Sequence, residues 1–395
     1  MQQLSAITKT LILTGFSALS LFAISPAQAA YFGGLGWLSN TSSSYANGIS
    51  ADGSVVVGSN RNANGYFEAF RWTQATGMVG LGFLDSNNQY SFANGVSADG
   101  SVVVGQSGYF GEAFRWTQSD GMVSLGSDTI SASDVSADGS VVVGTMKADI
   151  FDYRNRNEAF RWTQMHGLVR LGTLGNCGDE GCHSHAPNYF SSSATAVSAD
   201  GSVVIGDSNA LNGFSEGFRW TQSEGMVNLH NRHPSDVSAD GSKIVGTIWG
   251  NGQVKAFRST SYDIISLGFL SGANSSSATA VSADGSIIVG ASGSEAFRWT
   301  QGGGMVSLKE TLIGKGLDVS GWSLTSANAI SADGFTIVGN GINPSGQTEA
   351  WFANLSPEPV PEPLTILGSM AAIAFAAGFE RKFSKNKSEE KDPED

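Results

Sequence analysis

Short apolar runs separated by small and polar residues recur along most of the chain. Runs such as Val55–Val57 and Ile287–Val289 are apolar at every position, which indicates strands that are buried on both faces. Other runs, such as Gly77–Leu81 and Gly121–Leu125, keep their apolar residues but change one small or polar position between copies. That pattern is typical of a strand with one face in water. The chain is therefore expected to consist of short β-strands, some deep and some peripheral.

Seven copies of the tetrapeptide Ser-Ala-Asp-Gly mark a repeat, which has to be recognised before any count of domains. In the first copy the expected strands are Ala46–Ser50, Ser54–Gly58, Glu68–Thr73 and Gly77–Gly82, here called strands A, B, C and D. The Asp-Gly pair between A and B is a strong signal for a tight hairpin turn. The tetrapeptides lie at Ser50–Gly53, Ser97–Gly100, Ser136–Gly139, Ser198–Gly201, Ser238–Gly241, Ser282–Gly285 and Ser331–Gly334.

The last repeat lacks strand D. It has A at Ala327–Ser331, B at Phe335–Gly339 and C at Glu349–Leu355, and then runs into a proline-rich tail. The Leu-Gly pair that ends strand D stands alone near the start of the chain, within Gly33–Leu38. A strand at the N-terminus that completes the last repeat would close a ring, so we expect an all-β, seven-bladed β-propeller of four-stranded blades. A β-solenoid is the alternative, but its coils are usually shorter and would not divide one strand between the two ends.

The N-terminal segment, residues 1–29, predicts a secretory signal peptide. It has one early cation, Lys9, then the apolar stretch Leu11–Ile24, and ends with small residues at Ala27 and Ala29. These are the features that a signal peptidase recognises, so we expect the segment to be removed on export. The propeller is expected to occupy residues 30–355.

The C-terminal segment has three parts: a proline-rich linker at 356–363, an uncharged apolar segment at 364–379, and a charged tail at 380–395. A helix over 364–379 would be about 24 Å long, which is short for a permanent membrane anchor. With Pro361, Glu362 and Pro363 before it, this segment resembles the PEP-CTERM sorting signal. The resemblance implies an exosortase-type enzyme, cleavage near the Pro-Glu-Pro motif, transient anchoring in the membrane and a cell-surface or extracellular location. The family's pathway is often linked to exopolysaccharide. The tail is longer and more acidic than is usual in that family.

The repeats resemble the HAF family of extracellular repeat proteins over Gly33–Leu355. The matching motifs are ANGISADGSVVVG and EAFRWT followed by GMVSLG. Where the family has His-Ala-Phe, this chain has Glu-Ala-Phe in four blades, and the other three have Glu216-Gly217-Phe218, Lys255-Ala256-Phe257 and Glu349-Ala350-Trp351. The resemblance implies an exported repeat protein and supplies no catalytic residues.

Composition and repetition limit the possible functions. The chain has 51 glycines, 14% charged residues and a net charge of −13, with no basic cluster in its body, so nucleic acid is excluded as a partner. The repeated acids and arginines, such as Asp52 and Arg71, occur in many copies, whereas a catalytic site is formed by residues at one position in the fold. We therefore assign the repeated Asp to turns and the Arg to packing or pairing between blades, and we predict no catalytic residue and no cofactor.

The connections between strands predict which face binds ligands. The A–B and C–D turns are uniform and emerge on one face, whereas the B–C and D–A connections vary in length and emerge on the other. Variable loops on a rigid scaffold usually carry binding residues. Aromatic and hydrogen-bonding side chains there would suit a sugar or a peptide. The candidates are Asp152, Tyr153 and Arg154 in the loop 145–157, Trp249 in a B–C loop, and Trp322 in the loop 309–326.

The only two cysteines, Cys177 and Cys182, lie in the longest connection, residues 173–193. In an exported protein they indicate a local disulfide. The alternative is a metal site formed with His183 and His185, although this spacing lacks the usual paired ligands of zinc.

The functional prediction is a non-enzymatic surface or matrix module that binds extracellular polysaccharide or a surface protein. The alternative is a propeller glycoside hydrolase or lyase that acts on extracellular polysaccharide. Non-repeated carboxylates or histidines that converge on the ring axis would distinguish the two, and the candidates are Asp149, Asp152, His183 and His185.

Overall fold

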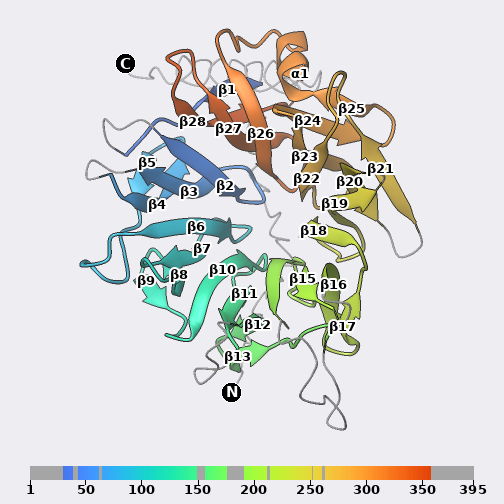
Figure 1. The fold of residues 1–395 in the computed structure, drawn as a ribbon. Coiled ribbons are helices and arrows are strands. Elements are labelled where there is room, and N and C mark those ends of the chain that lie inside the picture. The colour runs from blue at the N-terminus through green and yellow to red at the C-terminus, as the bar shows by residue number, and fades with distance from the viewer. Residues whose placement is uncertain are drawn as a thin grey trace, which may run out of the picture. The chain divides into compact units, whose positions relative to one another are not determined.

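The seven repeats form seven four-stranded antiparallel sheets, arranged around an axis as the blades of a β-propeller (Figure 1). The computed structural model describes residues 30–38, 43–61, 65–148, 156–175, 191–210, 214–250, 252–259 and 263–356, all of which belong to one unit, Ala29–Ser356. The predicted fold class is confirmed. Among these residues, no helix is long and apolar enough to cross a membrane. The predicted apolar helix at 364–379 lies outside them.

Each blade is a meander whose first strand lies nearest the axis, since these strands line the axial cavity. Blade 1 contains β2 (Ser44–Ile49), β3 (Val55–Arg61), β4 (Phe67–Thr73) and β5 (Gly77–Gly80). Blade 2 contains β6 (Ser91–Val96), β7 (Val102–Ser107), β8 (Ala113–Thr117) and β9 (Gly121–Ser124). Blade 3 contains β10 (Thr129–Val135), β11 (Val141–Lys147), β12 (Asn157–Thr163) and β13 (Gly167–Arg170). Blades 4 and 5 contain β14 (Ser192–Val197), β15 (Val203–Asn209), β16 (Ser215–Thr221) and β17 (Gly225–Asn228); β18 (Arg232–Val237), β19 (Ile244–Gly250), β20 (Gln253–Ser259) and β21 (Ile264–Gly268). Blades 6 and 7 contain β22 (Ser276–Val281), β23 (Ile287–Ser292), β24 (Glu295–Thr300) and β25 (Gly304–Ser307); β26 (Ser323–Ile330), β27 (Thr336–Ile342), β28 (Thr348–Asn354) and β1 (Tyr31–Gly34).

The N-terminal strand closes the ring. β1 pairs antiparallel with β28, with Phe32 opposite Ala353, and the two strands lie side by side in Figure 1. The strand starts two residues before the predicted Gly33 and ends at Gly34. The Leu-Gly pair comes directly after it, and the N–H of Leu35 donates to the carbonyl of Ala350 at 2.9 Å. The predicted division of one blade between the two ends of the chain is therefore confirmed.

The Ser-Ala-Asp-Gly turns satisfy their own polar groups. In the first turn, Asp52 Oδ1 accepts hydrogen bonds from Ser50 Oγ at 2.6 Å and from the N–H of Ser54 at 2.9 Å. The Ser50 hydroxyl in turn accepts from the N–H of Val55. Gly53 has a φ of 74°, a conformation that is costly for residues with a Cβ. This network confirms the prediction that the repeated aspartates form turns.

The alanines of the same tetrapeptide join the blades to one another. The N–H of Ala51 donates to the carbonyl of Ala98 in the next blade at 3.0 Å, and each following blade repeats the bond. The last of these bonds runs from Ala332 back to Ala51 at 2.9 Å, so seven hydrogen bonds form a closed circle. The donors, in order, are Ala51, Ala98, Ala137, Ala199, Ala239, Ala283 and Ala332.

An aromatic side chain on strand C fills the space beside each blade. In blade 1 it is Phe70 on β4, which is fully buried and lies opposite Gly58 of the neighbouring strand β3. A Cβ at Gly58 would clash with the backbone carbonyl oxygen of Tyr45 and come within about 3 Å of the Phe70 ring, so both the neighbouring strand and the ring require the glycine. Burying a phenylalanine contributes roughly 2–3 kcal/mol. The equivalent buried residues are Phe114, Phe160, Phe218, Phe257, Phe297 and Trp351.

A short helix, α1 (Leu308–Gly314), covers the start of the connection 309–326. The sequence had predicted a loop there. Ser307 caps its N-terminus by accepting a hydrogen bond from the N–H of Glu310. Leu308 and Leu312, one turn apart, are fully buried in the core between the last two blades. The helix forms because these two leucines add an apolar face to that core.

Candidate binding surfaces

The propeller has two faces, and exposed aromatic side chains gather on one of them. We call the face with the A–B and C–D turns the turn face, and the face with the B–C and D–A connections the loop face. Of the described aromatic residues, Tyr31 and Phe335 are exposed on blade 7 at the turn-face end. The others lie at the loop face: Tyr66, Tyr109, Phe110, Phe214 and Trp249.

Four aromatic residues on three neighbouring connections of blades 1 and 2 form what we call the aromatic cluster: Tyr66, Tyr90, Tyr109 and Phe110. Ring centroids are 5.6 Å apart for Tyr66 and Tyr90, 6.1 Å for Tyr90 and Tyr109, and 5.4 Å for Tyr109 and Phe110. Each pair meets edge to face, which is a favourable arrangement for aromatic rings. Tyr109 is 73% exposed and Phe110 85% exposed, so the cluster presents its ring surfaces to solvent.

Backbone hydrogen bonds hold the connections of the aromatic cluster together. The N–H of Gly108 donates to the carbonyl of Tyr90 at 2.7 Å, and the Ser107 hydroxyl donates to the same carbonyl at 3.0 Å. Asn88 Oδ1 accepts from the N–H of Tyr109 at 2.9 Å. The D–A connection between blades 1 and 2 is therefore tied to the B–C connection of blade 2. A ligand that met the cluster would find these rings already ordered, which lowers the entropic cost of binding.

The residues predicted from sequence have different environments. Trp249 is at the loop-face end of β19 and is 59% exposed, as a binding residue requires. Trp322 is partly buried and packs edge to face on Phe32, with ring centroids 5.4 Å apart, as part of the core of blade 7. Whether either contacts a ligand stays a prediction. The following lie outside the described residues: Asp149, Asp152, Tyr153, Arg154, Cys177, Cys182, His183, His185, Ala27, Ala29, Pro361, Glu362 and Pro363.

Sequence reasoning missed the aromatic cluster. Its members lie in short, unremarkable connections, and only the fold brings Tyr66 and Tyr90 beside Tyr109. A signal was present, because aromatic residues occur in three successive variable connections of the first two repeats.

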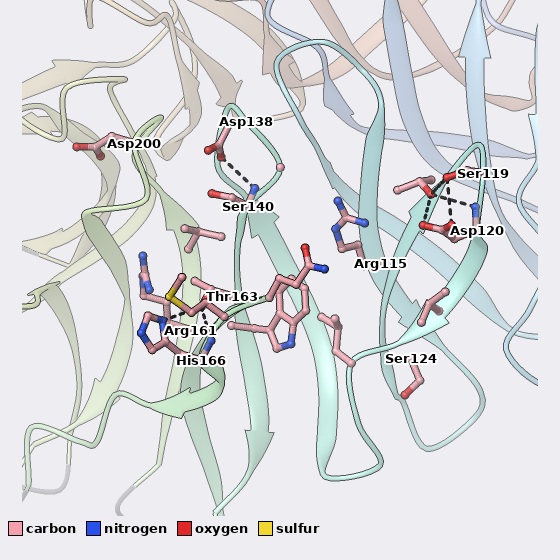
Figure 2. Close-up of a pocket in the computed structure, with 18 residues that line it drawn as sticks. Arg115, Ser119, Asp120, Ser124, Asp138, Ser140, Arg161, Thr163, His166 and Asp200 are labelled. Carbon is pink, nitrogen blue, oxygen red and sulfur yellow. Dashed lines mark hydrogen bonds between the residues drawn. The ribbon is translucent and has the colours of Figure 1, made fainter.

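The turn face contains a cavity of about 1000 Å³ between blades 2 and 3. Figure 2 shows Arg115 and Asp120 on one side of it and Asp138, Arg161 and His166 on the other. Several of its charged groups are occupied by scaffold contacts, although Arg115 Nε is buried without a hydrogen-bond partner among the described residues. Asp138 accepts from the N–H of Ser140 at 2.9 Å, Asp120 accepts from Thr117 Oγ1 at 2.9 Å, and Arg161 Nε donates to the carbonyl of Gly201 at 3.2 Å. The last bond confirms the predicted role of the repeated arginine between blades.

The inner strands of all seven blades line an axial cavity of about 260 Å³, into which two carboxylates project. Asp134 accepts from the N–H groups of Val135 and Val197, at 2.8 and 2.9 Å. Asp236 accepts in the same way from Val237 and Val281, at 2.7 and 2.8 Å. Each carboxylate therefore caps the inward-facing amides of two adjacent blades.

The two axial carboxylates have raised pKa values. Burial raises the pKa of Asp134 to about 6, against the opposing effect of its two backbone hydrogen bonds. Burial, together with the charge of Asp134, raises the pKa of Asp236 to about 7. Carboxylates that titrate in this range can act as general acids or bases. Asp134 and Asp236 are the non-repeated acids that line the ring axis among the described residues. The sequence had instead suggested Asp149, Asp152, His183 and His185 as candidates for such a site.

Comparison with solved structures finds matches of low identity. No family model matches the sequence, and no curated protein matches it. TolB from Acinetobacter baumannii has a TM-score of 0.42 and 13% identity over 78% of this chain; the match covers 65% of the TolB chain. The β-propeller domain of the Trilobed protease from Pyrococcus furiosus has a TM-score of 0.47 and 9% identity over 82% of this chain and 99% of that domain.

Proposed function

We propose that this protein is a non-enzymatic binding module of the cell surface or extracellular matrix, and that its loop face binds a glycan. The aromatic cluster carries this proposal. Four neighbouring rings, two of them more than 70% exposed, form an apolar surface that a monomeric protein rarely leaves uncovered. The apolar C–H faces of sugar rings fit such a surface, and the tyrosine hydroxyls add hydrogen bonds at its edge.

The proposal includes export and sorting. The signal peptide with Ala27 and Ala29 would be removed by signal peptidase. An exosortase-type enzyme would then process the chain near Pro361, Glu362 and Pro363, after transient anchoring by the segment 364–379. The loop with Asp152, Tyr153 and Arg154 would add polar contacts on the same face as the aromatic cluster. A glycan would be available to the propeller at that location.

A glycan array on the purified propeller, followed by calorimetry with the best ligand, tests the proposal. Replacing Tyr109 and Phe110 together by alanine should weaken binding by about 1–2 kcal/mol or more, roughly tenfold, because binding energy concentrates in a few aromatic residues. Phe214→Ala is the matched control. Phe214 lies on the same face and is 71% exposed, but it belongs to blade 4.

Both variants should melt within a degree or two of the wild type, because the replaced rings are exposed. If the array gives no ligand, or if the Phe214→Ala variant loses as much affinity as the double variant, the aromatic cluster is not the binding surface.

The axial carboxylates are the residues to test for the alternative function, a glycoside hydrolase or lyase that acts on extracellular polysaccharide. Asp134 and Asp236 have pKa values in the range of a general acid. Their hydrogen bonds to backbone amides favour a structural role instead, since both oxygens of each carboxylate already accept from the blades. Release of reducing sugars from an array ligand, abolished by Asp134→Asn or Asp236→Asn without a loss of binding, would establish the enzyme.

A further inference from the structure

One groove on the turn face departs from the repeat. The first residue of strand B lies against the turn glycine of the next blade, as Val55 does against Gly100. In blade 5 this residue is Lys243, whose aliphatic stem lies against Gly285 in the same way. The other blades have an uncharged residue at this position: Val55, Val102, Val141, Val203, Ile287 and Thr336.

The ammonium group makes the groove between blades 5 and 6 cationic. This groove has a volume of about 390 Å³, and Lys243, Arg258 and Arg298 line it against a single acid, Asp284. Asp284 is already occupied, because its Oδ1 accepts from the N–H of Ser286 at 2.9 Å and from Ser282 Oγ at 2.7 Å. Three cations therefore line the groove beside one carboxylate that the turn itself uses. Lys243 also attracts Asp240, but that carboxylate too accepts hydrogen bonds within its own turn, from Ser238 Oγ at 2.6 Å and the N–H of Ser242 at 3.0 Å.

The groove between blades 2 and 3 has a different charge balance. It shares the strand C arginines, Arg115 and Arg161, and the turn aspartate Asp138, which corresponds to Asp284, but Asp120 and Asp200 line it as well. The protein as a whole carries a net charge of −13. A local excess of positive charge in an acidic protein indicates a binding site for a negatively charged group.

The arginines of the blade 5–6 groove also lack a bond that the repeat makes elsewhere. Arg71 and Arg161 donate Nε to the turn carbonyl of the next blade at 3.2 Å. At Arg258 and Arg298, as at Arg115 in the blade 2–3 groove, the Nε atom is buried and has no hydrogen-bond partner among the described residues. The blade 5–6 groove differs in having two such arginines and a lysine beside a single aspartate. Arg258 is only 8% exposed, and its guanidinium lies over the ring of Trp299 at 5.9 Å. Burial lowers the pKa of Arg298.

An unpaired buried donor on a cation is costly, and an anion would remove that cost. We infer that the blade 5–6 groove binds an oxyanion group, held by Lys243, Arg258 and Arg298. Arginine side chains offer planar forks that match the oxygens of carboxylate, sulfate and phosphate groups, and the lysine adds a mobile point charge. The site lies on the face opposite the aromatic cluster and does not depend on it. The oxyanion can come from a free inorganic ion or from an acidic group on a polysaccharide.

Calorimetry with the full propeller at low ionic strength tests the site. Sodium sulfate and sodium glucuronate are the small probes, and a sulfated polysaccharide and a polyuronate are the polymeric ones. Sodium chloride at equal ionic strength corrects for screening. We expect saturable binding of at least one small anion and a rise in Tm that saturates with it. Tighter binding of a polymer than of its small counterpart identifies the polysaccharide as the source, and equal affinity identifies the free ion.

Lys243→Val is the decisive variant, because it restores a residue that the other blades use. Affinity for the anion should fall at least tenfold, while Tm without anion stays near that of the wild type. Lys255→Ala is the matched control, since it removes one positive charge from the same blade, where Lys255 lies over the ring of Phe269 at 5.6 Å. If Lys243→Val fails to fold, Lys243→Gln and Arg298→Gln repeat the test.

The inference is wrong if no probe saturates beyond the effect of chloride. It is also wrong if Lys255→Ala weakens binding as much as Lys243→Val, because the effect would then be one of net charge. A loss of glycan binding at the aromatic cluster leaves this test unaffected.

Discussion

The closure of the ring by β1 predicts that Leu35 has a larger structural role than its counterparts in other blades. Leu35 is 7% exposed and belongs to the core shared by blades 1 and 7. Leu171 holds the equivalent position after the outer strand of blade 3, and it is also 7% exposed. Leu→Ala at either site removes the same side chain from a similar environment. Each should lower the free energy of unfolding by about 3 kcal/mol.

The two variants should differ in what happens locally. β13, the strand before Leu171, follows its neighbour β12 through a short turn of the chain. β1 has no such link to β28 and is held there by contacts that include the hydrogen bond from Leu35 to Ala350 and the ring of Phe32 near that of Trp351, 6.4 Å between centroids. A loss of ~3 kcal/mol is a large share of a typical stability of 5–15 kcal/mol. In Leu35→Ala it should therefore detach β1 before global unfolding. Leu171→Ala should unfold in one step.

Chemical denaturation followed by tryptophan fluorescence measures the free energies, and limited proteolysis with mass spectrometry detects a free N-terminal strand. Deletion of residues 30–38 should leave the edge of β28 unpaired and promote aggregation. Moving the same residues to follow Ser356 should restore stability, because the strand then follows β28 directly. An unchanged Tm after the deletion, or equal protease sensitivity of the two leucine variants, would refute closure by this strand.

Two further predictions concern the turns and the tail. Hydrogen bonds from the N–H of Ser101 and the hydroxyl of Ser97 lower the pKa of Asp99 to about 2. The Asp99 carboxylate therefore stabilises the fold fully above the unfolded-state pKa near 3.8, and this stabilisation is lost as the pH falls through 2. Asp99→Asn should thus have a lower Tm than the wild type at pH 7, with glycan affinity per folded molecule unchanged. The difference in Tm should shrink between pH 4 and pH 2. A difference that stays constant with pH would contradict the role assigned to the Asp99 carboxylate. If the Pro-Glu-Pro motif marks a processing site, surface protein from the native host should lack residues 364–395 by mass spectrometry, and an intact C-terminus would instead indicate a retained anchor.

The fold could be predicted from the sequence because each blade carries the same local signals. Asp-Gly turns, apolar runs and a variable outer strand recur seven times, so an error in one copy is corrected by the others. The place of β1 in the ring was predicted because the Leu-Gly pair that follows it is part of the repeat, although the strand begins two residues before the predicted Gly33 and ends four residues before the predicted Leu38. The helix α1 was missed since it occurs once, in a connection with no repeated pattern.

The candidate sites were harder to predict for the same reason. The aromatic cluster draws on three connections that are far apart in sequence, and only the arrangement of blades 1 and 2 brings them together. Asp134 and Asp236 stand where the other blades have Gly or Ala on their inner strands. The sequence alone does not show that backbone amides of two adjacent blades lie beside them to be capped. Lys243 was visible as a departure from the repeat, but its meaning depends on the arginines of two adjacent blades.

The circle of alanine hydrogen bonds has a consequence for the electrostatics of the axis. In an α-helix the peptide dipoles point the same way, add along the axis and leave unsatisfied groups at both ends. Here the seven N–H donors each point to the next blade in the same rotational sense, from Ala51 to Ala98 and finally from Ala332 to Ala51. Dipoles arranged head to tail around a circle cancel as vectors, and the circle has no first donor or last acceptor. The blades are thus joined at the centre by polar bonds that add no net dipole to the axial cavity, so its charge is set by Asp134 and Asp236.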